Sequence, residues 1–113
     1  MPRYPHDVEV EVTFLSAENG GRSRPIMSGY RSQFHYDGYD WDAVHTSIGR
    51  DQVAPGETVR AYLSFLSPEM HAGRIRPCMP FLIREGKCVV GYGVVLNVLE
   101  LEDSAARARL VVR

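Results

Sequence analysis

Two stretches of the chain alternate apolar and polar side chains, residue by residue. Between Val8 and Phe14 the apolar side chains alternate with glutamates and a threonine, and the segment from Val59 to Phe65 repeats the pattern. A period of two places the apolar side chains on one face of an extended strand, whereas a helix would distribute them around its axis. Both stretches are therefore predicted to be half-buried β-strands.

Turn signals divide the rest of the chain into short segments. The clearest turn is Val53–Glu57, because Pro55 presets the first central position and Gly56 accepts the second. Further strands are predicted at Val44–Ile48, Phe81–Arg84, Cys88–Glu100 and around Leu110, with turns at Asp37–Trp41 and Glu102–Ala106 and a loop at Ser67–Pro80. We find no sustained apolar spacing of three and four residues, so the sequence predicts an all-β barrel or sandwich.

Gly91 and Gly93 stand two residues apart within the long predicted strand Cys88–Glu100. Glycines at this spacing lie on one face of a strand, where they indicate a sharp bend or a close approach by another backbone. We expect one of the two at this point of the sheet.

Length and charge narrow the class of protein. A chain of 113 residues is predicted to form one domain, residues 1–113, with a single core. The net charge of −1 argues against general coating of nucleic acid, so an anion site would be a local patch. The sequence carries no apolar stretch typical of a signal peptide or a membrane span, which predicts a cytoplasmic protein with no membrane partner. Cys78 and Cys88 are then expected to be reduced thiols.

A local basic patch is present between Gly20 and Phe34. This segment combines several glycines with Arg22, Arg24 and Arg31. Arginine presents a planar fork of donors that matches phosphate, and glycine allows a bent backbone to come close. The segment is predicted to bind an anion, and it contains no obvious nucleophile.

The motifs of this segment and of the second half of the chain resemble those of one known family, the C-terminal β-barrel domain of elongation factor Tu. The resemblance extends from about Val8 to Leu99 and is carried, in order, by Gly20-Gly21-Arg22, Pro25-Ile26, Gly29-Tyr30-Arg31-x-Gln33-Phe34, Pro55-Gly56, Ile83-Arg84-Glu85-Gly86 and Val90-Gly91-Tyr92-Gly93-Val94-Val95. It implies a free-standing domain folded as a six-stranded antiparallel closed β-barrel, without the GTPase domain.

In that family the barrel contacts the T-stem backbone of aminoacyl-tRNA. The matching positions imply an RNA- or anion-binding set of Arg22, Gln33, Glu85 and Gly86. The phosphate-binding motif Gly-x-x-x-x-Gly-Lys-Ser/Thr does not occur in the sequence, so no GTP and no other cofactor is expected.

An enzymatic function has the least support in the sequence. Its only sequence signal is four dispersed histidines, His6, His35, His45 and His71. Their spacing is not that of a zinc site, and neither cysteine has a nearby base, so no catalytic residues and no metal ligands are predicted.

The stretch after Phe34 departs most from the family pattern. It carries Asp37, Asp40 and Asp42 where the family has a threonine-rich sequence, and each carboxylate would repel a neighbouring phosphate by roughly 1 kcal/mol. The same stretch carries three aromatic residues, Tyr36, Tyr39 and Trp41, of the kind that anchor protein interfaces. The leading prediction is therefore a non-enzymatic module that binds a protein, with the translation machinery as the candidate source. The alternative is weak binding of tRNA or another RNA by the inherited surface.

Overall fold

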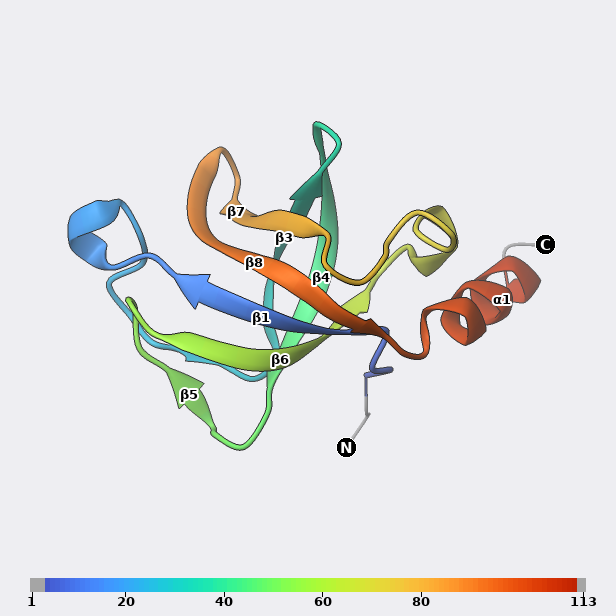
Figure 1. Ribbon diagram of the computed structural model, residues 1–113, viewed down its shortest axis with the longest axis horizontal. Helices are drawn as coiled ribbons and strands as arrows, with labels where there is room; N and C mark the ends of the chain where they lie inside the picture. The colour runs from blue at the N-terminus through green and yellow to red at the C-terminus, as the bar shows by residue number, and fades with distance from the viewer. Residues whose placement is uncertain (1–3, 112–113) are drawn as a thin grey trace.

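The computed structural model describes residues 4–111, whose six long strands form a closed antiparallel barrel (Figure 1). The strands are β1 (Val8–Phe14), β3 (Tyr30–Tyr36), β4 (Tyr39–Ser47), β6 (Thr58–Phe65), β7 (Pro80–Glu85) and β8 (Cys88–Val98). They pair in the order β1-β6-β4-β3-β7-β8, and β8 closes the barrel by pairing with β1. The predicted six-stranded closed barrel is confirmed.

Shorter elements lie around the barrel. The strands β2 (Ile26–Met27) and β5 (Gln52–Val53) form a separate two-stranded sheet. Two 3₁₀ turns, η1 (Ala17–Asn19) and η2 (Pro68–Met70), lie in the connections after β1 and β6. Apart from η2, the segment between β6 and β7 is a loop, as predicted, and Pro80 at its end begins β7. Within residues 4–111, no helix has the length and apolar content needed to span a bilayer.

The alternating strands fill the barrel as their sequences predict. Val8, Val10, Val12 and Phe14 of β1 are buried, while Glu9, Glu11 and Thr13 lie on the outer face. Aromatic rings complete the core, where Phe34 stacks on Phe81 with ring centroids 4.3 Å apart. Period two thus separates core from surface along a single strand.

The glycines of β8 mark a close backbone approach. A Cβ at Gly91 would lie 2.9 Å from the carbonyl oxygen of Thr13. One at Gly93 would lie 2.4 Å from the carbonyl oxygen of Glu11 and 2.7 Å from the ring of Phe81. The prediction of a close approach is confirmed, because only glycine lets β8 pack this tightly against β1.

The hairpin between β3 and β4 is longer than the sequence suggests. We predicted a turn at Asp37–Trp41 and a short strand at Val44–Ile48, but β4 begins at Tyr39 and only two residues form the turn. Asp37 and Gly38 both have positive φ angles, 51° and 80°, as a two-residue turn of type I′ requires. The aromatic residues that follow favour an extended strand, so they continue the ladder.

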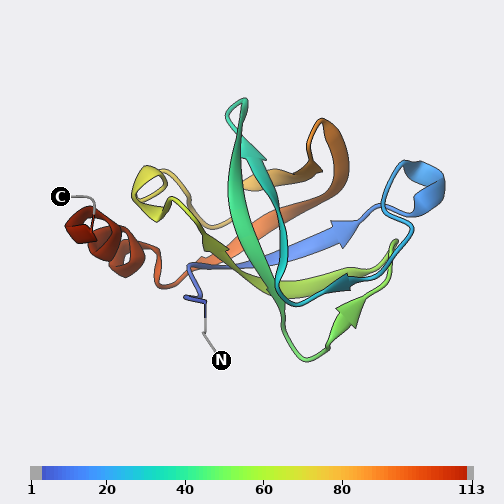
Figure 2. The ribbon, with the colours of Figure 1, turned by 180° about the vertical axis from the view of Figure 1, so that it is seen from behind.

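The C-terminal segment is a helix, which corrects two predictions. In place of a polar turn at Glu102–Ala106 and a last strand around Leu110, the chain forms α1 (Leu101–Val111). Alanine is the strongest helix former, and acids in the first turn complement the helix dipole. Leu101, Ser104 and Ala105 are buried at helical spacing, and α1 packs against η2 in both views of the ribbon (Figures 1 and 2).

Candidate RNA-binding face

Four residues predicted from separate motifs come together near the β7–β8 turn. Arg22 lies in the loop between η1 and β2, Gln33 lies in β3, and Glu85 and Gly86 end β7 and begin the turn. Antiparallel pairing places Gln33 opposite Arg84 on one side and opposite Asp42 on the other. The barrel therefore brings the predicted RNA- or anion-binding set to one region of its outer surface.

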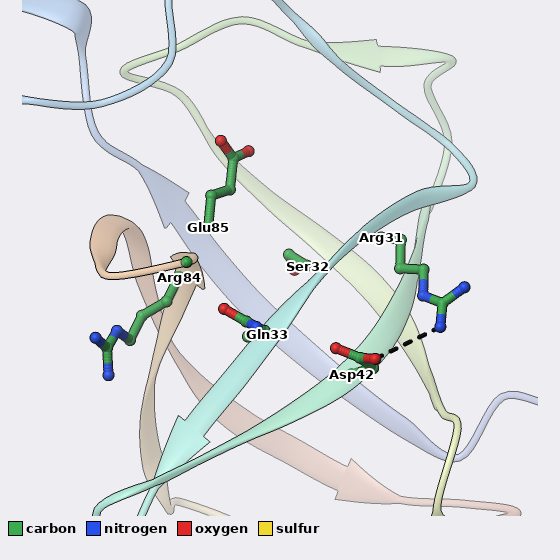
Figure 3. Close-up of a pocket in the computed structure, with 7 residues that line it drawn as sticks. Arg31, Ser32, Gln33, Asp42, Arg84 and Glu85 are labelled. Carbon is green, nitrogen blue, oxygen red and sulfur yellow. Dashed lines mark hydrogen bonds and ion pairs between the residues drawn. The ribbon is translucent and has the colours of Figure 1, made fainter.

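Two adjoining hollows share Glu85 and form what we call the arginine face. The first, of about 260 Å³, is lined by Arg22, Ser23, Arg24 and Glu85. The second, of about 200 Å³, is lined by Arg31, Ser32, Gln33, Asp42, Arg84, Glu85 and Gly86 (Figure 3). Four arginines and two carboxylates surround these hollows, which gives a local charge of +2 in a chain whose net charge is −1.

Glu85 lines both hollows and accepts hydrogen bonds from two neighbouring side chains. Its Oε2 atom accepts hydrogen bonds of 2.5 Å from Arg22 Nη1 and from the hydroxyl of Tyr30. Partial burial acts to raise the pKa of Glu85, but the bonds from Tyr30 and Arg22 outweigh it and lower this pKa below its usual value. The Arg22 guanidinium also lies over the Tyr30 ring, 5.0 Å from its centroid. These contacts fix the position of the Arg22 guanidinium.

Gln33 offers an unused hydrogen-bond acceptor. Its Oε1 atom is buried and has no hydrogen-bond partner among residues 4–111. Its side chain lies in the second hollow between β7 and Asp42 (Figure 3). A buried acceptor without a partner is costly, so a ligand donor such as a hydroxyl would stabilise this site.

Each of the three aspartates has a basic neighbour. Arg31 Nη2 lies 3.5 Å from Asp42, Arg84 Nη1 lies 3.3 Å from Asp40, and Arg74 Nη2 lies 3.7 Å from Asp37. Asp40 also contacts Nδ1 of His35 at 2.8 Å. The acidic stretch is therefore partly neutralised by the fold, which reduces the repulsion that the sequence predicts for a phosphate.

The comparison with known families agrees with the barrel fold. Residues 3–99 match the family model described as elongation factor Tu C-terminal domain. The chain belongs to this family. Members of the elongation factor Tu C-terminal domain family are translation-factor β-barrels without catalytic activity of their own. Helix α1 lies outside the matched residues.

The three aromatic residues predicted as a protein-binding patch do not share one surface of this elongation factor Tu-type barrel. Tyr36 is 7% exposed, and its hydroxyl bonds Nδ1 of His71 at 2.7 Å. Trp41 is half-buried, with its ring perpendicular to that of His71 at a centroid distance of 4.8 Å. Only Tyr39, next to the turn, presents an exposed ring, with 65% of its surface accessible.

Sequence reasoning missed two contributors to the arginine face. The sequence showed Tyr30 only as part of a family motif, whereas in the structure its hydroxyl donates to Glu85 and positions that carboxylate. Arg84 is adjacent to Glu85 in the sequence, yet it pairs with Asp40 while Glu85 pairs with Arg22. Successive residues of a strand point to opposite faces or directions, so adjacency in sequence was a poor guide here.

Within residues 4–111 no group of three or more histidine, cysteine, aspartate or glutamate side chains could hold a metal ion. Cys78 and Cys88 are exposed free thiols.

Proposed function

We propose that this elongation factor Tu-type domain is a non-enzymatic module that binds the backbone of RNA, with tRNA as the first candidate. The observation that supports it is the convergence of Arg22, Gln33, Glu85 and Gly86 on two adjoining hollows with a local positive charge. The family relationship points to translation as the setting.

The chemistry of the arginine face suits a sugar–phosphate backbone better than a base sequence. Arg22 and Arg24 offer guanidinium groups to phosphate, and these contacts carry no sequence information. Gly86 has a φ angle of 61° and open space where a Cβ would lie, so a ligand backbone can approach the turn. The amide side chain of Gln33 lines the second hollow and can hydrogen-bond a ribose 2′-hydroxyl, the group that separates RNA from DNA.

Binding should be weak and strongly dependent on salt. The face offers a few phosphate contacts, and each contact that releases a counterion steepens the fall of affinity with salt concentration. We expect fluorescence-anisotropy titrations with tRNA to show binding at low salt that is largely lost at physiological ionic strength.

The variant Arg22→Ala tests which surface is responsible. We expect it to weaken tRNA binding several-fold, since one charge-assisted contact contributes about 1 kcal/mol or more. The matched control is Arg60→Ala, because Arg60 is exposed on β6 and pairs only loosely with Glu9 at 3.9 Å. Absence of tRNA binding at low salt, or equal weakening by both variants, would contradict the proposal.

A second candidate, binding of a protein of the translation machinery, is favoured by one specific observation. The β3–β4 hairpin extends beyond the barrel wall (Figure 1) and carries the exposed ring of Tyr39. Tyrosine is common among the residues that dominate interface energies. Affinity capture from nuclease-treated extract should then recover a translation protein with the natural chain. The same capture with Tyr39→Ala should not recover it. If recovery needs intact RNA, the result favours RNA binding instead.

A further inference from the structure

A small aromatic shelf lies on the outer wall of the barrel beside the arginine face. It consists of Tyr92 on β8 and Leu82 on β7, which lie opposite each other in the ladder. Tyr92 is 50% exposed and Leu82 is 36% exposed, although both lie in the middle of paired strands. Together they form a small apolar patch on the strand wall that is open to solvent.

Register connects this shelf to the arginine face. Leu82 lies opposite His35 on β3, and Nδ1 of His35 lies 3.2 Å from Nη1 of Arg84. Phe81 and Ile83 are buried, so Leu82 and Arg84 both lie on the outer side of β7. With neighbouring strands about 4.8 Å apart, Tyr92 is about 10 Å from the strand that carries Gln33. A short run of nucleotides can span this distance.

The polar border of the shelf suits a nucleobase. On the side away from β7, Tyr92 lies opposite Thr13, whose hydroxyl bonds that of Thr58 at 2.8 Å. These hydroxyls are exposed and can donate to or accept from the edge of a base. A flat aromatic ring with hydroxyls on one side and guanidinium groups on the other matches the base, edge and phosphate of a nucleotide.

The size of the shelf argues against a protein occupant. A stable protein interface buries about 800 Å² per partner, whereas two side chains cover only a fraction of that area. One base stacked on one tyrosine needs no larger surface.

We propose that Tyr92, with Leu82 beside it, stacks an unpaired nucleobase of an RNA strand whose phosphates lie on the arginine face. The inference rests on the proposed RNA binding and narrows its ligand class to RNA with a single-stranded segment next to the bound backbone. In a continuous duplex the bases are stacked on one another and cannot reach the ring.

The test compares a short single-stranded RNA with a blunt duplex of the same sequence, each titrated by fluorescence anisotropy. We expect the natural chain to bind the single strand more tightly. Tyr92→Leu keeps an apolar side chain and removes the ring, so it should weaken single-strand binding by about tenfold and leave duplex binding unchanged. Tyr92→Phe keeps the ring and should bind like the natural chain.

Two controls make the result specific to stacking. Tyr4→Leu changes another exposed tyrosine, which precedes β1 at the end of the barrel far from the β7–β8 turn, and it should have no effect. An oligonucleotide with 2-aminopurine should lose fluorescence on binding the natural chain, because stacking quenches this base, and should not lose it with Tyr92→Leu.

The possible failures are distinguishable. If neither RNA form binds at low salt, the proposed function fails and this inference falls with it. If the duplex binds and Arg22→Ala weakens it, but Tyr92→Leu binds the single strand like the natural chain, only the stacking inference is overturned. An equal loss with Tyr4→Leu, or unquenched 2-aminopurine on the natural chain, would also overturn it.

Discussion

The two ends of the barrel use similar polar and aromatic side chains in opposite ways. Beside the β7–β8 turn, Glu85 accepts hydrogen bonds from Tyr30 and Arg22, and Glu85 and Arg22 line a hollow at the surface. Beside η2 and α1, Tyr36 and His71 bond to each other inside the core, where His71 is fully buried. The first arrangement holds charged groups at the surface; the second attaches a loop to the barrel.

The helix end contains a second buried polar contact. The Asp7 carboxylate accepts from the backbone N–H of Phe65 at 2.8 Å and from the Ser104 hydroxyl at 2.5 Å. Burial raises the pKa of Asp7, while the bonds from Ser104 and Phe65 act in the opposite direction. Asp7 thus connects the start of β1 with β6 and α1. The same residue types are therefore surface groups at one end of the barrel and buried structural contacts at the other.

The largest expected change in the free energy of unfolding comes from Asp7, at the end of the barrel that packs against α1. Asp7→Ala leaves two buried donors without an acceptor and opens a small void, so it should lower the free energy of unfolding by about 3 kcal/mol. Asp7→Asn keeps an acceptor for Phe65 and should cost less. Chemical denaturation measures both, and RNA affinity of the folded variants should not change. A marked loss of affinity would show that the two ends are coupled.

His71 should make this end sensitive to acid. Burial, followed by the charge of Arg74, lowers the pKa of His71 to about 4 from an ordinary 6.5. Between these two pH values the unfolded chain binds a proton at His71 that the folded chain does not. The contribution of neutral His71 to the free energy of unfolding is therefore fully present above pH 6.5 and is lost as the pH falls towards 4. The loss is on the order of 3 kcal/mol.

Denaturation curves at several pH values should show this slope reduced in His71→Asn, which does not titrate but keeps an acceptor for Tyr36. The comparison with His71→Asn is needed because other buried groups also change stability with pH. Burial lowers the pKa of His45 to about 4, which gives a slope of the same sign. Asp7, whose pKa is raised, gives the opposite slope at acid pH. An unchanged slope in His71→Asn would exclude His71 as the source.

The smallest effect on stability is expected at the arginine face. Asp42→Asn removes an exposed ion pair with Arg31 and should change the free energy of unfolding by less than about 0.5 kcal/mol. It should strengthen RNA binding about fivefold, because one carboxylate beside the phosphate repels it by roughly 1 kcal/mol. Anisotropy titrations measure this change. Weaker binding in Asp42→Asn would mean that the carboxylate itself contacts the ligand.

Prediction from sequence succeeded where the determining contacts are local. The alternation in Val8–Phe14 identified a strand and its buried face, and Pro55-Gly56 identified a turn, closed by the hydrogen bond from the N–H of Glu57 to the carbonyl of Ala54 at 3.1 Å. The family motifs identified the chain as an elongation factor Tu C-terminal domain. The roles assigned to Arg22, Gln33, Glu85 and Gly86 stay predictions, although the barrel places these residues together.

Prediction failed where distant segments determine the outcome. Period-two alternation separates two faces of a strand, but it does not say which polar groups another segment covers. Tyr36 is buried because the segment that follows η2 brings His71 against it, and these two residues are 35 positions apart in the sequence. The helix α1 is anchored by Ser104 bonding to Asp7, at a separation of 97 residues.

By itself, then, the sequence determined the alternating strands at Val8–Phe14 and Val59–Phe65, the turn at Pro55-Gly56, the close approach at Gly91 and Gly93, and the family. These follow from backbone sterics and side-chain periodicity, which act between near neighbours. Only the tertiary structure decided which aromatic rings are exposed, which aspartates are neutralised, and that Tyr92 lies beside the arginine face. Those outcomes depend on strand register and on loop packing, where the free energy is gained between residues far apart along the chain.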